Sequence, residues 1–270
     1  MKVKVIPVLE DNYMYLVIEE ITREAVAVDV AVPKRLLEIV GREGVSLTAV
    51  LTTHHHWDHA RGNPELARLR PGLAVLGADE RIFSLTRRLA HGEELRFGAI
   101  HVRCLLTPGH TSGHMSYFLW EDDCPDPPAL FSGDALSVAG CGLCLEGSAQ
   151  QMYQSLAELG TLPPETKVFC GHEHTLSNLE FAQKVEPCND HVRAKLSWAK
   201  ARPLSGLGKR VGGTEGPMVT RACGHSRRGM RMTCPQCRRL WARSREYGCR
   251  PGASTVTWTL REASGDRVLS

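Results

Sequence analysis

Residues 53–59 read Thr-His-His-His-Trp-Asp-His and follow an apolar run of Val, Leu and Ala. That run predicts a buried strand. Because side chains alternate along an extended chain, His54 and His56 can point to one side while His55 points away. A turn after them would bring two further ligand-type residues back to that side, Asp58 and His59. Imidazole and carboxylate together suit zinc, iron or manganese, so the stretch predicts a metal site at a strand end.

Short β-type runs alternate with amphipathic helical segments up to about residue 175. Strands are predicted at 3–8, 13–18, 25–30, 45–53, 74–77, 100–106, 115–119, 129–132 and 167–170. Helices are predicted from Pro33 onward and near 61–69, 148–159, 176–185 and 191–200. This mixture favours a layered α/β (α+β) fold over an all-α or all-β fold.

Three further segments each place ligand-type residues in a glycine-containing turn after a predicted strand. They are Thr-Pro-Gly-His-Thr-Ser-Gly-His at 107–114, Phe-Ser-Gly-Asp at 131–134 and Cys-Gly-His-Glu-His at 170–174. With residues 53–59, they resemble the motif series of the metallo-β-lactamase superfamily in order and approximate spacing. Within it the chain is similar to the glyoxalase II family, the hydroxyacylglutathione hydrolases. That similarity rests on Val-Leu-Glu-Asp-Asn-Tyr at 8–13, residues 53–60, Gly-His-Glu at 171–173 and residues 178–187, and it runs from residue 1 to about 200.

The resemblance implies an αββα sandwich that holds two divalent metal ions. Zinc is the first candidate for these ions, and iron or manganese is the alternative. It implies one metal on three histidines, His54, His56 and His110. It implies a second metal on Asp58, His59 and His172, with Asp134 as the bridge between the two. A hydroxide bridging the metals would attack an ester or thioester carbonyl, with Asp58 and Asp134 as the catalytic residues, and no side-chain nucleophile is required.

The chain departs from the glyoxalase II pattern where that family binds glutathione. The family places a lysine and a tyrosine in the loop at 142–147, where this sequence has Leu143 and Leu145 on either side of Cys144. The family tyrosine after the last His-Glu is His174 here. The resemblance therefore implies a substrate pocket at these four residues that lacks the charge and the phenol suited to glutathione.

Other polar residues are predicted to play no direct chemical part. Ser132 lacks the flanking glycine spacing of a nucleophile elbow. His55 and His101 are interpreted as structural or solvated, and His114 as a residue that orients a neighbour of the metals from behind.

The sequence divides at about residue 200. We expect a hydrolase domain at 1–175, a remnant of the family's helical domain at 176–200, and an Arg/Gly-rich, disordered tail at 201–270. The tail has 14 Lys and Arg against 4 Asp and Glu, while the whole chain has a net charge of +3. A zinc knuckle is the alternative for the tail, with the ligands Cys223, His225, Cys234 and Cys237. Without interleaved aromatic residues, nucleic-acid binding by the tail is not expected.

No export signal and no long apolar run is visible, so we expect a cytoplasmic protein with reduced cysteines and no membrane contact. The leading hypothesis is a monomeric hydrolase of small acyl thioesters or esters. Two alternatives remain open: a metal-binding member of the fold with little or no activity, and an enzyme like the persulfide dioxygenases, which use one iron. An oxygenase should lack the second set of ligands, so Asp58, His59 and His172 favour hydrolysis.

Overall fold

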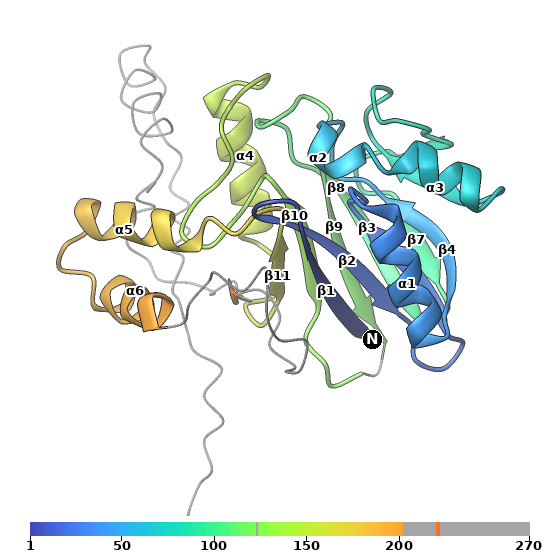
Figure 1. The fold of residues 1–270 in the computed structure, drawn as a ribbon. Helices are drawn as coiled ribbons and strands as arrows, with labels where there is room; N and C mark the ends of the chain where they lie inside the picture. Colours follow the sequence, from blue (N-terminus) through green and yellow to red (C-terminus); the bar gives the residue numbers. More distant parts are fainter. Residues whose placement is uncertain (123, 202–219, 222–270) are drawn as a thin grey trace, which may run out of the picture.

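The computed structural model describes residues 1–122, 124–201 and 220–221 of the 270-residue chain. Two sheets lie face to face with helices on their outer sides (Figure 1). The first sheet has the strand order β1-β2-β3-β4-β5-β6 and the second has the order β12-β11-β10-β9-β8-β7. The layered α/β fold predicted from the sequence is therefore confirmed.

The first sheet begins with an antiparallel meander and continues with parallel strands. Its strands are β1 (Lys2–Val8), β2 (Asn12–Ile18), β3 (Glu24–Val28), β4 (Ser46–Leu51), β5 (Ala74–Gly77) and β6 (Arg87–Arg88). Three helices accompany it: α1 (Pro33–Glu43), α2 (Trp57–Ala60) and α3 (Asn63–Leu69). Pro33 opens α1 and Gly44 ends it with a left-handed backbone, φ 62°, which glycine adopts without strain.

The second sheet is antiparallel except for the pair β10 and β11. Its strands are β7 (Glu94–Phe97), β8 (Ile100–Leu106), β9 (Met115–Glu121), β10 (Ala129–Gly133), β11 (Lys167–Cys170) and β12 (Thr220–Arg221). The helices after it are α4 (Ala149–Leu159), α5 (Thr175–Val185) and α6 (Asp190–Ala201). A capping box between Ser148 and Gln151 begins α4.

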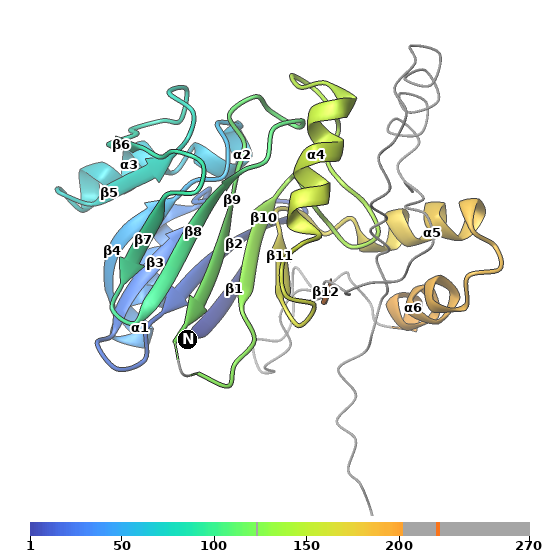
Figure 2. The same cartoon turned by 180° about the vertical axis from the view of Figure 1, so that it is seen from behind.

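Apolar side chains fill three successive layers. Between the sheets, Tyr15, Leu51, Tyr117 and Phe131 belong to one buried cluster. A second cluster joins the outer face of the first sheet to α1 and α3, and a third joins the outer face of the second sheet to α4. Figure 2 shows the same sandwich from behind, with α4 beside β10 and β11. The interior is thus αββα in section.

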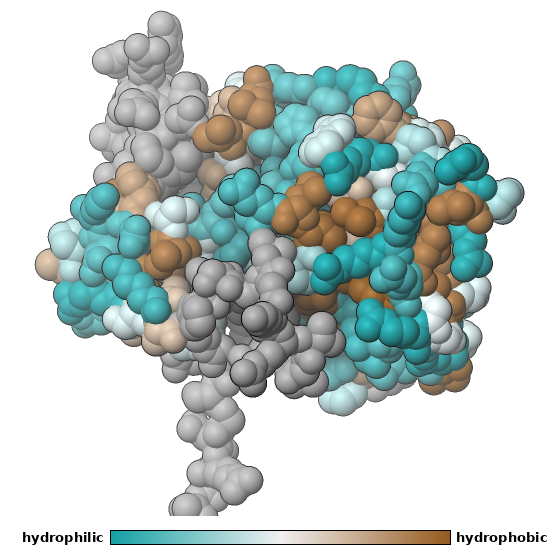
Figure 3. Space-filling model, viewed as in Figure 1, coloured by the Kyte–Doolittle hydropathy of each residue, from teal (hydrophilic) through white to brown (hydrophobic). Residues whose placement is uncertain are grey.

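Helices α5 and α6 pack on each other beyond the second sheet, around Leu179, Val192 and Leu196. Within the described part of the chain, no helix is both long and apolar enough to span a membrane. On the face shown in Figure 3, apolar residues form separate patches among hydrophilic ones.

Several predicted boundaries and elements need correction. Strands β6 and β7 were not predicted, because they are edge strands of only two and four residues and most of their side chains are exposed. The strand expected at 45–53 ends at Leu51, since the chain leaves the sheet there to carry the site residues. The turn expected after the histidines is the short helix α2. The two-residue strand β12 lies in the tail, where no element was expected. The disorder expected for the tail and the alternative zinc knuckle otherwise fall outside the described residues.

Candidate metal centre

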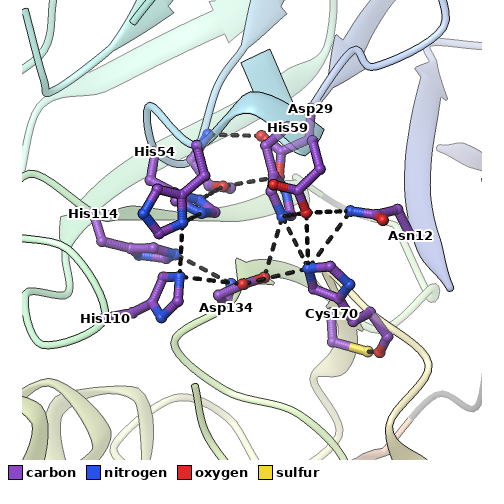
Figure 4. A network of polar contacts seen from close by, with 12 residues as sticks. Asn12, Asp29, His54, His59, His110, His114, Asp134 and Cys170 are labelled. Carbon is purple, nitrogen blue, oxygen red and sulfur yellow. Dashed lines mark hydrogen bonds and ion pairs between the residues drawn. The ribbon is translucent and has the colours of Figure 1, made fainter. Parts of the chain in front are cut away.

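Six of the seven predicted ligands form two clusters where several strands end at one edge of the sandwich (Figure 4). The first cluster joins His54 and His56, which follow β4, to His110, which follows β8. The ring atom His56 Nδ1 lies 3.1 Å from His54 Nε2 and 3.1 Å from His110 Nε2. His54 and His110 are buried, with exposed fractions of 0% and 6%. The three side chains predicted for one metal are thus in mutual contact.

The second cluster joins α2 to the segment after β11. His59 Nε2 lies 3.1 Å from His172 Nε2. The carboxylate atom Asp58 Oδ2 lies 3.3 Å from each of these two nitrogens. Because α2 turns the chain back after His56, Asp58 and His59 face a residue more than one hundred positions away.

Asp134, the seventh predicted ligand, lies between the two clusters. It follows β10, and its Oδ2 is 3.3 Å from His110 Nε2 and 3.4 Å from His172 Nε2. Its Oδ1 is 3.4 Å from His59 Nε2. One carboxylate therefore contacts a histidine of the first cluster and two histidines of the second.

The donor atoms fit a metal centre. Among the residues that the structure describes, four groups of three side chains place their ligand atoms within 4.8 Å of one another, and these groups include both clusters. Ring nitrogens approach each other to 3.1 Å in each cluster, where at most one nitrogen of a pair can carry the proton between them. Asp134 Oδ1 is buried without a hydrogen-bond partner. A buried carboxylate oxygen without a partner is costly unless a cation compensates it.

A second layer of hydrogen bonds fixes the ring orientations. Asp29 Oδ2 lies 3.0 Å from His59 Nδ1, and Asp11 Oδ1 lies 2.9 Å from His172 Nδ1. The carbonyl oxygen of Leu143 lies 2.9 Å from His110 Nδ1. With Nδ1 held in this way, the Nε2 atom of each ring faces the interior of the site, which is the usual arrangement around a metal.

The charges in the site favour cations. Burial opposes the charged form of His59, but Asp134, Asp29 and Asp58 raise its pKa well above the usual value. For His172, burial lowers the pKa while hydrogen bonds to Asp134 and Asp58 raise it, to about 10. Burial would raise the pKa of Asp134, yet the neighbouring imidazoles hold it well below the usual range. Carboxylates thus attract positive charge into a buried space.

His114 supports the centre without belonging to either cluster. It is fully buried, and burial lowers its pKa to about 3, so the ring is neutral. Its Nε2 accepts a hydrogen bond from the backbone N–H of Asp134 at 3.2 Å, and its Nδ1 lies 2.8 Å from Thr107 Oγ1. His114 contacts the backbone of the residue between the clusters, in line with its predicted role of orienting a neighbour.

The residues expected to line the substrate pocket differ in their surroundings. Leu143 and Leu145 have exposed fractions of 54% and 57%. Cys144 is half-buried and packs against the apolar cluster beneath α4. The ring of His174 stacks on His172 at 5.1 Å, and its Nε2 lies 3.1 Å from Asp11 Oδ2.

The remaining polar residues singled out in the sequence have partners of other kinds. His55 points away from the ligands, toward Asp79 at 3.4 Å and Glu146 at 3.7 Å. His101 stacks on Trp120. The Ser132 hydroxyl is buried and donates to the carbonyl oxygen of Leu136 at 2.6 Å.

Asp29, Asp11, Asn12, Arg81 and Glu146 contribute to the centre or its rim but were not singled out from the sequence. Asn12 Nδ2 donates to Asp58 Oδ2 at 2.8 Å. Asp29 could have been found, because it directly follows β3, the strand parallel to β4, and the carboxyl ends of parallel strands meet at one sheet edge.

A separate hollow of about 620 Å³ lies toward the other end of β9 from the metal centre. Its lining includes Arg103, Trp120, Cys124 and several prolines, but none of the seven predicted ligands. The chemistry of the donor atoms, rather than the size of a cavity, therefore identifies the candidate site.

Comparison with known proteins agrees with this geometry. Residues 14–172 match the model of the family described as the metallo-beta-lactamase superfamily. A human "hydroxyacylglutathione hydrolase-like protein" is 89% identical, and the match covers 100% of both chains. The mouse protein of the same name is 86% identical over 203 residues, which cover 75% of this chain and 72% of the mouse chain. The crystal structure of ETHE1 from Myxococcus xanthus matches with a TM-score of 0.57 and 36% identity, and the match covers 64% of this chain and 76% of that chain.

Proposed function

Because the chain belongs to the metallo-beta-lactamase superfamily as a glyoxalase II-like member, we propose that it hydrolyses acyl thioesters or related esters with two divalent metal ions. The observation that carries this proposal is the position of Asp134. Its Oδ2 lies near His110 of the first cluster and near His172 of the second, and its Oδ1 lies near His59 of the second. A carboxylate in that position can serve two ions at once.

In this proposal His54, His56 and His110 hold one ion, and Asp58, His59 and His172 hold the other. Asp134 serves both. When bound, two divalent ions, preferably zinc, would supply a nucleophilic hydroxide at neutral pH and stabilise negative charge on a carbonyl oxygen.

Residues around the proposed metal positions prepare the site for this chemistry. Asp29, Asp11 and the carbonyl of Leu143 keep three imidazoles in the orientation that leaves Nε2 available. Asp58 Oδ2 accepts from the amide of Asn12, which holds this carboxylate beside His59 and His172. The burial of His54 and His59 excludes bulk water from the floor of the site, which strengthens electrostatic interactions there.

The thioester class is supported by the names of the human and mouse relatives, which describe hydroxyacylglutathione hydrolase-like proteins. The rim of the site argues for a substrate less polar than glutathione. Leu143 and Leu145 are more than half exposed on the loop that follows β10 and cannot pair with the carboxylates of a tripeptide. We therefore propose an acyl group on a carrier whose bound part is largely apolar.

The test is a thioester panel with the zinc-loaded full-length chain. It should include S-D-lactoylglutathione and acyl-N-acetylcysteamine thioesters of increasing acyl length. Asp134→Ala serves as the inactive control, and Glu94→Gln, an exposed change on β7, as the matched control. Hydrolysis that Asp134→Ala abolishes and Glu94→Gln retains supports the proposal. The absence of hydrolysis above the Asp134→Ala level on every substrate contradicts it, and one bound iron per chain would favour an oxygenase.

A further inference from the structure

A network of three charged side chains, Asp79, Arg81 and Glu146, joins the loop at 141–147 to the segment after β5. The guanidinium of Arg81 donates to both carboxylate oxygens of Glu146, at 2.7 Å from Nη1 and 2.7 Å from Nη2. The same guanidinium donates from Nε and Nη2 to Asp79, at 3.0 Å and 2.7 Å. Asp79 is 8% exposed and lies just beyond β5. Arg81 therefore connects the first sheet to the loop that follows β10.

Glu146 also holds the segment that carries His110. Its Oε2 accepts from the backbone N–H of Ser112 at 2.9 Å and from the Ser112 hydroxyl at 3.0 Å. Three segments far apart in the sequence thus meet at one carboxylate. A paired guanidinium, a backbone N–H and a hydroxyl all donate to this carboxylate, which gives the contact a defined geometry rather than that of a loose surface pair.

The loop between Gly142 and Gly147 lies against the site with little room to move. The N–H of Gly142 donates to the carbonyl of Asp134 at 2.8 Å, and that of Gly147 donates to Gly109 at 3.1 Å. A Cβ atom at Gly142 would lie 2.2 Å from the Asp134 oxygen. Within this loop, the carbonyl of Leu143 contacts His110 Nδ1. Glu146 thus acts on both partners of that hydrogen bond: on Leu143 through the loop and on His110 through Ser112.

We propose that Glu146, held by Arg81, is a positioning residue that directs the Nε2 atom of His110 into the metal centre. The proposal rests on the two-metal site proposed above, but not on the identity of its substrate. If Glu146 is lost, the Leu143 carbonyl and the His110 ring no longer share one fixed support. The ring can then rotate, and the ion that His110 binds is held more weakly.

The test measures zinc affinity of the full-length chain by competition with a chromophoric chelator. Glu146→Ala should weaken the binding of one of the two zinc ions by about 10- to 100-fold. This range is typical when a metal ligand loses its outer hydrogen-bond partner. Arg81→Gln should act in the same direction, and the double variant should lose little more than either single variant, because the pair acts as one unit. Glu94→Ala removes another Glu–Arg pair, with Arg103, and serves as the matched control. It should leave zinc affinity unchanged.

A second experiment tests whether Glu146 affects zinc affinity through His110. In a His110→Gln background, Glu146→Ala should have no further effect on zinc affinity. If Glu146→Ala does not fold, Glu146→Gln, which keeps the shape and removes the charge, should give a smaller loss in the same direction. Unchanged zinc affinity in the Glu146 and Arg81 variants, or an undiminished effect in the His110→Gln background, overturns the proposal. Zinc binding without hydrolysis in the wild type would remove the proposed function and leave this test valid, whereas a wild type that binds no zinc contradicts both.

Discussion

The carboxylate of Asp29 lies directly behind His59, with Oδ2 3.0 Å from Nδ1 and both side chains almost completely buried. The same carboxylate accepts from the backbone N–H and the hydroxyl of Thr53, each at 2.8 Å. Asp29 thus connects the strand end that carries His54 to the helix α2 that carries His59. This one residue joins the supports of the two proposed metal positions.

We predict that Asp29→Asn weakens zinc binding by about 10- to 100-fold without unfolding the chain. The asparagine can direct its NH2 group at His59 Nδ1, which then becomes an acceptor and places the ring proton on Nε2, facing the site. Zinc competition measures the effect, with Asp190→Asn on the exposed start of α6 as the control. Equal zinc affinity in Asp29→Asn and the wild type would show that Asp29 does not set the tautomer of His59.

The candidate ligands could be proposed from the sequence because the compact motif at 53–59 and the three strand-end segments together resemble the motif series of the superfamily. The supports behind them could not. Asp11 and Asp29 are single carboxylates in short connections, a type of residue common in any turn. The pair Arg81 and Glu146 is separated by 65 positions, so no local pattern indicates that they meet. Backbone carbonyls, such as that of Leu143, are present at every residue and carry no sequence signal.

The buried strands of the fold could also be predicted from local sequence patterns, whereas the edge strands could not. Strands buried on both faces, such as β2 and β9, are continuous apolar runs that stand out from their flanking turns. Edge strands such as β7 alternate over only four residues and are partly exposed, so propensity alone does not separate them from a loop. Tertiary pairing with β8 decides their conformation.

We predict that Leu143→Lys combined with Leu145→Tyr raises kcat/KM on S-D-lactoylglutathione by about tenfold or more. The two leucines are exposed at the rim, so the longer polar side chains can be accommodated without repacking the core. The gain should appear mainly in KM, because these groups bind away from the reacting carbonyl. Steady-state kinetics on wild type and double variant decide the matter. Efficient wild-type turnover that the double substitution leaves unchanged would show that this loop does not set specificity.

The ion pairs of Glu43 predict a specific loss of stability in acid. Hydrogen bonds from Lys4 and Lys2 lower the pKa of Glu43 to about 2, although burial opposes this. Because the folded-state pKa lies below the unfolded value, the stabilisation is present at neutral pH and is lost as the pH falls from about 4.5 toward 2.

Glu43→Gln should therefore lower the free energy of unfolding by about 1 kcal/mol at pH 7, allowing for solvent screening, and by much less at pH 3. Urea unfolding at both pH values measures the difference. Glu38→Gln, an exposed change on the same helix, is the control and should behave as the wild type at both. An equal loss for Glu43→Gln at pH 7 and pH 3 would contradict the assignment of the stabilisation to these ion pairs.

We propose that Asp134 serves two metal ions in one hydrolytic centre. Elemental analysis of zinc-loaded, desalted full-length protein tests it most directly, with wild type and Asp134→Ala prepared side by side. We predict about two zinc ions per wild-type chain and loss of both in Asp134→Ala, because that carboxylate contacts histidines of both clusters. One ion or fewer in the wild type, or an undiminished zinc content in Asp134→Ala, would contradict the account.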